Sequence, residues 1–159
     1  MPKFDLNKYK QVDKNEVDYP KTRDNLKIFL NAYFKARERV GMPREPKITA
    51  TLSEIPVSSG RVSKEAEDIL IYNEQAQEEF LELHELFIRG YSAIQHPFKP
   101  DIAMRRKKIF MDRFVRGYSV YVTAQRNNVS EDLVTADTNI IVIQFASALE
   151  LLVFKNGKI

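Results

Sequence analysis

Apolar side chains recur at intervals of three and four residues along much of this chain, which is the spacing of amphipathic α-helices. Polar and charged side chains fill the intervening positions, so each stretch has one face suited to a core. We therefore predict an all-α, multi-helix domain with no sheet of three or more strands. The predicted helices cover residues 22–40, 64–95, 101–117, 119–127 and 130–153.

The first two parts of the chain are predicted to be an arm and a helix with a linker. Residues 1–21 contain five lysines and no apolar period, so we predict a mobile basic arm there. The first helix begins at Thr22, a favourable capping residue, and ends before Gly41. The remainder of the segment 22–63 has the composition of a linker, because the segment contains three prolines, two glycines and four serines.

The third part, residues 64–159, is predicted to hold an acidic helix followed by a DNA-binding helix-turn-helix unit. The acidic helix 64–95 has eight carboxylates against Lys64 and Arg89, together with an apolar stripe that indicates core packing. Its acidic side chains either keep DNA away from this helix or contact a basic partner.

Helix 101–117 carries the strongest charge signal in the sequence. On a helical wheel its apolar side chains form one arc, and most of its basic side chains lie on the opposite face. Pro100 and Asp101 are typical of a helix start, with Asp101 as a cap, and Gly117 is typical of a left-handed helix end. Residues 99–126 contain eight basic side chains against two acidic ones, which indicates a surface that faces phosphate groups.

A short helix, a turn and a longer helix follow, in the order of a helix-turn-helix motif. Asn128 tolerates the left-handed backbone that the turn requires, and Ser130 is a favourable cap for the second helix. Thr135, Thr138 and Asn139 are candidates for base contacts, since asparagine pairs with adenine and threonine contacts the thymine methyl group. The complete set of candidate DNA-binding residues is Arg105, Arg106, Lys108, Arg113, Arg116, Arg126, Asn127, Asn128, Ser130, Thr135, Thr138 and Asn139.

The second helix of this motif is acidic, which counts against a simple DNA-binding surface. Residues 130–154 contain Glu131, Asp132, Asp137 and Glu150 and no lysine or arginine. Guanine is normally read by arginine or lysine, and carboxylates repel phosphate groups. The later part of this helix is apolar almost all round, so we expect the upstream helices, or a second copy in a homodimer, to cover it.

Composition argues against several other classes of function. The chain of 159 residues has no cysteine, which excludes disulfides, thiolate zinc sites and a cysteine nucleophile. His84 and His96 lack the spacing and partners of a metal site, and the five glycines build no phosphate-binding loop. We expect no cofactor, no metal and no enzyme activity. No stretch resembles a membrane span or an export signal, so we expect a cytoplasmic protein without a membrane partner.

Several short motifs stand in the order found in one group of phage proteins. They are Pro46 to Thr49, the Ser63 and Glu67 start of the acidic helix, and the later residues Phe145, Ala146 and Leu149. Across residues 22–154 the sequence resembles the ArpU and RinA group of phage late-gene transcriptional regulators. The resemblance implies a C-terminal part similar to region four of bacterial sigma factors, which binds promoter DNA of late operons and helps RNA polymerase to start there. It also implies a location in the bacterial host cell.

Three functions are consistent with these patterns. The first is a regulator of phage or prophage late genes, an activator that binds double-stranded DNA and recruits RNA polymerase. The second is a protein-interaction module that acts on RNA polymerase or a sigma factor and binds DNA poorly alone. The third is a phage packaging protein similar to a small terminase subunit, which would assemble into a ring.

Overall fold

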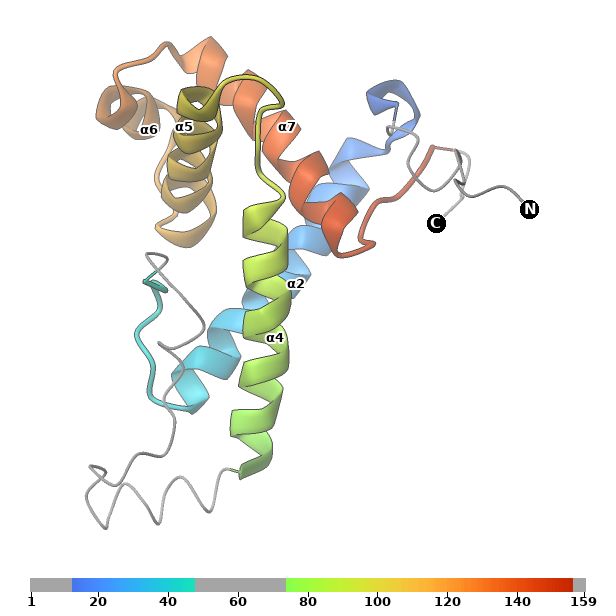
Figure 1. Cartoon of the computed structure of the whole chain (residues 1–159), viewed down its shortest axis with the longest axis vertical. Helices are drawn as coiled ribbons and strands as arrows, with labels where there is room; N and C mark the ends of the chain where they lie inside the picture. The colour runs from blue at the N-terminus through green and yellow to red at the C-terminus, as the bar shows by residue number, and fades with distance from the viewer. Residues whose placement is uncertain (1–12, 48–73, 156–159) are drawn as a thin grey trace.

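The computed structural model describes residues 13–47 and 74–155, and this part of the chain is helical (Figure 1). The described residues contain no β-strand. They contain one isolated antiparallel β-bridge, which pairs Val17 with Phe154. The predicted all-α class is therefore confirmed for the described residues. The five α-helices are α2 (Tyr19–Arg39), α4 (Glu74–Ser92), α5 (Pro100–Phe110), α6 (Val120–Asn127) and α7 (Glu131–Ala148).

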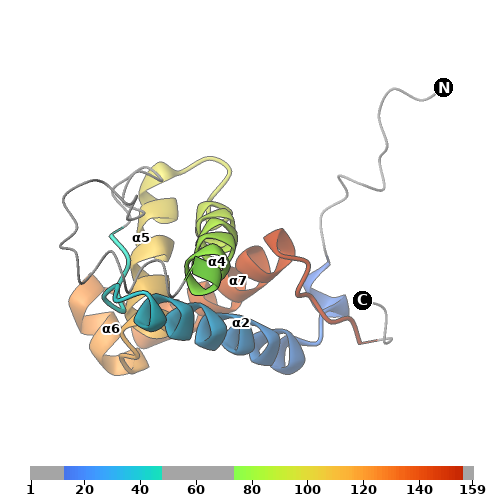
Figure 2. The same ribbon diagram turned by 90° about the horizontal axis from the view of Figure 1, so that it is seen from below.

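Helix α7 is the centre of the packing, because it contacts each of the other four α-helices. Helices α2 and α4 also pack on each other and cover one part of α7, whereas α5 and α6 lie beside its first half (Figures 1 and 2). This arrangement buries the apolar side of α7 within a single chain. The described residues thus supply the intramolecular cover that was one of the two expected arrangements.

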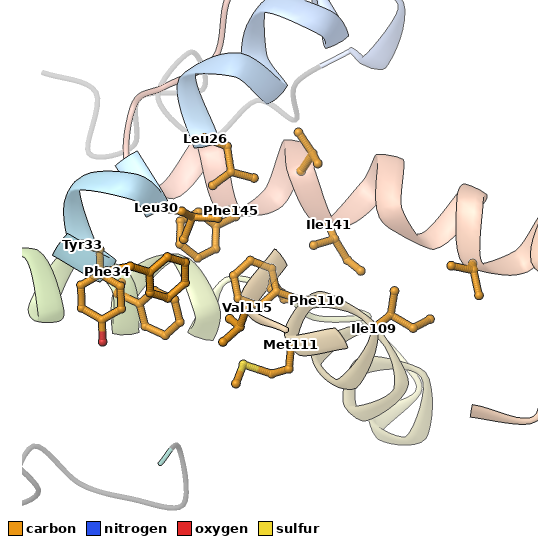
Figure 3. Packing of buried hydrophobic residues seen from close by; sticks show 14 of the residues in the cluster. Leu26, Leu30, Tyr33, Phe34, Ile109, Phe110, Met111, Val115, Ile141 and Phe145 are labelled. Carbon is orange, nitrogen blue, oxygen red and sulfur yellow. The ribbon is translucent and has the colours of Figure 1, made fainter. Parts of the chain in front are cut away.

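Aromatic rings from four helices form the core (Figure 3). The ring of Phe110 in α5 stacks on that of Phe145 in α7, with centroids 5.1 Å apart, and Tyr33 of α2 stacks on Phe87 of α4 at 4.5 Å. Gly90 lets α4 approach α7 closely, because a Cβ atom at this position would lie 2.6 Å from the Phe145 ring. The core consequently fixes α2, α4 and α5 against one helix.

Helix α2 begins earlier than predicted, at Tyr19, because the side chain of Asp18 caps it by accepting a hydrogen bond from the Lys21 amide at 3.2 Å. Thr22 lies within the helix and is buried. A 3-10 turn at Lys14–Glu16 precedes the helix. The prediction of a mobile arm is therefore wrong for residues 13–21, and residues 1–12 lie outside the described residues.

Helix α7 ends at Ala148, five residues before the predicted end. Glu150 adopts a left-handed backbone with φ 58°, and the Leu151 amide donates to the Ala146 carbonyl at 2.8 Å. This is the hydrogen-bond pattern of a Schellman motif, which normally uses glycine at the left-handed position. Because no glycine marks this position in the sequence, the helix was predicted to continue to residue 153.

The residues after Ala148 run back along the start of α2. Asn25 donates to the Leu151 carbonyl at 3.1 Å, and the Val153 amide donates to the Thr22 hydroxyl at 3.0 Å. The Asp18 amide donates to the Val153 carbonyl at 2.7 Å. We call Leu151–Phe154 the return segment.

The remaining boundaries agree with the predictions in part. The predicted helix 64–95 is observed as Glu74–Ser92, with residues 64–73 outside the described residues. Helix α5 has no side-chain cap, so the predicted cap at Asp101 is not formed. A π-helical turn, Met111–Val115, continues α5, and the following Gly117 has the predicted left-handed backbone with φ 74°.

Candidate nucleic-acid interface

Helices α6 and α7, for which a helix-turn-helix motif was predicted, pack on each other and are joined by a short turn. Asn128 has the expected left-handed backbone, with φ 54° and ψ 46°, and the Val129 amide donates to the Ala124 carbonyl at 3.0 Å. The Ser130 hydroxyl caps α7 by accepting from the Leu133 amide at 3.1 Å. The local chemistry of Asn128 and Ser130 thus fixes how α7 leaves the turn.

The first half of α7 has a distinct outward face. Its exposed residues are Glu131, Asp132, Thr135, Ala136 and Asn139. Thr138 is different, because it is only 4% exposed and its hydroxyl donates to the Val134 carbonyl of the same helix at 2.7 Å. The prediction that Thr138 is placed to contact a base is therefore wrong, whereas Thr135 and Asn139 are accessible.

The helical wheel predicted that Arg105 and Arg106 lie on an outward cationic face. The structure places them differently. Both donate to the carboxylate of Asp137 in α7, Arg105 at 2.8 Å and Arg106 at 3.4 Å. Asp137 is only 2% exposed, so this pair of ion pairs joins α5 to α7 in the interior. Met104, which the wheel placed on the apolar face, is 60% exposed instead. The orientation of α5 thus differs from the prediction, and in this orientation two arginines compensate the buried acid.

A second buried carboxylate, Asp112, organises the π-helical turn and α6. It accepts hydrogen bonds from Arg116 at 2.6 Å, from Arg126 at 3.4 Å and from Asn127 at 3.1 Å. Arg116 also forms an ion pair with Glu45, and these hydrogen bonds raise its pKa. Arg116, Arg126 and Asn127, three of the candidate DNA-binding residues, therefore have a structural contact in this protein.

Two further arginines, Arg23 and Arg113, lie near the start of α6. Neither forms an ion pair with a carboxylate of the described residues. Arg113 donates to the Tyr118 carbonyl at 2.7 Å, and the Arg23 guanidinium of α2 lies 5.7 Å from the Phe114 ring centroid. Burial lowers the pKa of Arg113, and the neighbouring charge of Arg23 lowers it further.

The same cluster contains unsatisfied polar atoms. Within the described residues, the Nε atoms of Arg23 and Arg113 and the hydroxyl of Tyr19 are buried without a hydrogen-bond partner. Burial also raises the pKa of Tyr19. Sequence reasoning missed Arg23 and Tyr19, because they lie about ninety residues before Arg113 and no sequence period relates them.

Lys108 is the candidate cation on α5 that stays exposed and forms no ion pair with another described residue. Arg126 also keeps nearly half of its side chain in solvent and lies over the Tyr118 ring, 5.0 Å from the centroid. Among the basic candidates, Lys108 and Arg126 are thus the most accessible to a phosphate group.

The first half of α7 exposes fewer carboxylates than its sequence contains. Asp137 is neutralised by Arg105 and Arg106, which leaves Glu131 and Asp132 as the exposed acids in its first half. Both lie in the first turn, where a negative charge stabilises the helix dipole.

Within residues 13–47 and 74–155, no group of three or more histidines and acids is placed to hold a metal ion, and no helix is long and apolar enough to cross a membrane.

Comparisons with models of protein families, with curated proteins and with solved structures found no match to this chain.

Proposed function

We propose that this protein is a sequence-specific DNA-binding transcriptional regulator that uses α6 and α7 as its helix-turn-helix unit. The observation that carries the proposal is the outward face of α7. There, Thr135, Ala136 and Asn139 are exposed on a helix whose opposite side is held by the core and by the Asp137 ion pairs. A rigid helix with small exposed side chains suits entry into the major groove.

Contacts to phosphate groups would come from α5 and α6 rather than from α7, which has no cationic side chain. Lys108 and Arg126 are accessible for this role, and Arg113 lies beside the start of α6, the helix that crosses the DNA backbone in such motifs. The resemblance to phage late-gene regulators extends the proposal to activation of late operons through RNA polymerase in a bacterial host cell.

The test is selection of bound fragments from random duplex DNA, followed by affinity measurements over a range of salt concentrations. Replacing Lys108 and Arg126 by alanine should weaken binding to all sequences and reduce the salt slope by about one unit per lost phosphate contact. Replacing Asn139 by alanine should instead reduce the preference among sequences by about 1–3 kcal/mol, with little change in slope.

The matched control for the cationic variants is Lys27→Ala, which removes an exposed lysine from α2. Arg105 and Arg106 are unsuitable for this test, because their loss leaves the Asp137 carboxylate buried without a partner. The proposal is wrong if the wild-type protein shows no salt-dependent binding to any duplex.

A second function, a protein-interaction module for RNA polymerase or a sigma factor, is favoured by the exposed acids Glu131 and Asp132. Carboxylates at the exposed start of α7 suit a basic protein surface better than phosphate groups. The variant Glu131→Gln with Asp132→Asn separates the two functions. It should increase DNA affinity if α7 faces DNA, and it should weaken binding to RNA polymerase if α7 faces that protein.

A further inference from the structure

A cavity of about 300 Å³ lies between the end of α2, the first half of α4 and the segment 42–47 that follows α2. Its volume is at the lower end of the range for small-molecule sites. Met42, Pro43 and Phe80 form its apolar wall, and Arg37 and His84 also line it. None of these lining residues comes from α6 or α7.

Arg37 is a buried cation without an anion partner in the part of the chain that the structure describes. It is 2% exposed, and its Nε donates to the Pro43 carbonyl at 2.6 Å while one terminal nitrogen donates to the Tyr33 hydroxyl at 3.1 Å. Its guanidinium also lies over the rings of Tyr33 and Phe80, 5.6 and 5.7 Å from their centroids. The second terminal nitrogen has no acceptor among the described residues.

The lack of a carboxylate partner for Arg37 among the described residues matters energetically, because a buried charge normally has a partner of opposite charge. Glu45 also lines the cavity, yet its carboxylate forms an ion pair with Arg116 rather than with Arg37. Neutral acceptors and aromatic faces stabilise the guanidinium in part. The cavity therefore has a positive charge at its wall that an incoming anion would neutralise.

His84 can supply a second donor, in the tautomer that carries its proton on Nε2. The Tyr33 hydroxyl accepts a hydrogen bond from Arg37 and lies 2.7 Å from Nδ1 of His84, to which it can donate its own proton. A neutral imidazole that accepts at Nδ1 carries its own proton at Nε2. Burial, followed by the charge of Arg37, lowers the pKa of His84, and burial raises the pKa of Tyr33 to about 12. Both rings are thus held in their neutral forms.

We propose that this cavity binds a small organic carboxylate with an apolar body. The carboxylate would accept hydrogen bonds from the free edge of Arg37 and from Nε2 of His84, and the apolar part would contact Met42, Pro43 and Phe80. Arginine is the side chain whose planar donors match a carboxylate best. Lys47, which also lines the cavity, adds a second positive charge.

The test uses isothermal titration calorimetry and thermal unfolding of the full chain with phenylacetate, its neutral analogue phenylacetamide, and inorganic phosphate. Phenylacetate should bind with a millimolar or lower dissociation constant and raise the melting temperature. Phenylacetamide should bind at least about tenfold more weakly, because it cannot neutralise Arg37. Phosphate should also bind more weakly than phenylacetate, since it has no apolar body to fill the cavity.

Equal affinity for phenylacetamide would overturn the proposal, and so would the failure of hexanoate, benzoate, phenylacetate and phenylpropionate alike to bind at millimolar concentration. Tighter binding of phosphate than of any of these carboxylates would also overturn it, in favour of a simple anion site.

Two variants locate the ligand. Arg37→Gln removes the charge and should abolish the difference between acid and amide, although its loss also removes the bonds to Tyr33 and Pro43. Met42→Trp leaves those bonds intact and fills the cavity from its partly exposed wall, so it should abolish phenylacetate binding, whereas the matched Met42→Leu should retain it. Wild-type affinity in Met42→Trp would place the ligand elsewhere and refute the proposal.

Discussion

Three charged side chains, Asp112, Asp137 and Arg37, are each 2% exposed, and they explain most of what the sequence did not reveal at the residue scale. Helical periodicity treats every charged residue as a surface residue, and it contains no information about which charges meet across helices. Arg105 lies thirty-two positions from the aspartate that binds it. The candidate phosphate-binding arginines were therefore identified by composition, while their actual partners required the fold.

The local backbone chemistry of the turn between α6 and α7 was predicted correctly, although two of the expected helix caps are not formed. Asn128 has the left-handed conformation and Ser130 caps the next helix, because both features depend on side chains within a few residues. The buried triad of Arg37, Tyr33 and His84 had no such signal. Its members come from two helices, and nothing in their spacing indicates that they share a cavity.

The state of His84 makes stability depend on pH. Its folded pKa is lowered by burial, so below the unfolded value of about 6.5 the unfolded chain binds a proton that the folded protein excludes. The free energy of unfolding should then fall as the pH drops through that value, with this group contributing up to about 1.4 kcal/mol per pH unit until its folded pKa is reached.

Urea unfolding of the wild type and of His84→Gln at successive pH values measures this contribution. Carboxylates elsewhere titrate in both proteins, so the informative quantity is the difference between the two curves. That difference should shrink as the pH falls, because only the wild type loses stability through the imidazole. Parallel curves would show that His84 is protonated equally in both states.

At the scale of the elements, the existence of all five helices was predicted, and the errors lie at their ends. Helix α7 stops where Glu150 takes the left-handed position of a Schellman motif, and α2 starts at a cap provided by Asp18 rather than by Thr22. Both boundaries are set together with the return segment, which packs on α2 after more than a hundred intervening residues. Local sequence signals are weak where a distant segment decides the boundary.

The close approach of α4 to α7 depends on Gly90. In Gly90→Ala the new methyl group would lie within 2.7 Å of three atoms of the Phe145 ring, so one helix has to move or the ring has to leave its position. We expect a loss of stability of about 1–3 kcal/mol, despite the better helix propensity of alanine. Thermal and urea unfolding measure the change.

A control on the same helix is Ser92→Ala, which changes an exposed position. The double variant Gly90→Ala with Phe145→Leu should lose less stability than the sum of the two single changes, because the smaller side chain makes room for the methyl group. Strict additivity would mean that the contact between Gly90 and Phe145 does not limit the helix spacing.

On the scale of the whole molecule, the sequence indicated a helical domain around an apolar C-terminal helix, and α7 does contact each of the other four α-helices in the part of the chain that the structure describes. What the sequence lacked was the order of the helices around α7 and the path of the return segment. These depend on contacts between residues far apart in the chain, which a single sequence does not encode in any local period.

The hydrogen bond between Val153 and Thr22 is one such long-range contact, and its loss should be measurable. Thr22→Val keeps the shape of the buried side chain but leaves the Val153 amide without its acceptor, which should cost about 1–3 kcal/mol. Hydrogen exchange at the Val153 amide should accelerate at the same time. Thr135→Val, on the exposed face of α7, is the control and should change neither quantity.

The return segment also has a consequence for synthesis on the ribosome. Helix α2 is synthesised well before the return segment, yet Asp18, Thr22 and Asn25 find their partners in Leu151 and Val153. The hydrogen bonds at the start of α2 therefore cannot form until translation has passed Phe154, so this end of the helix stays open to chaperones and proteases for longer than the part that packs on α4. The rate at which the codons of the return segment are translated should thus influence how much of the protein survives to fold.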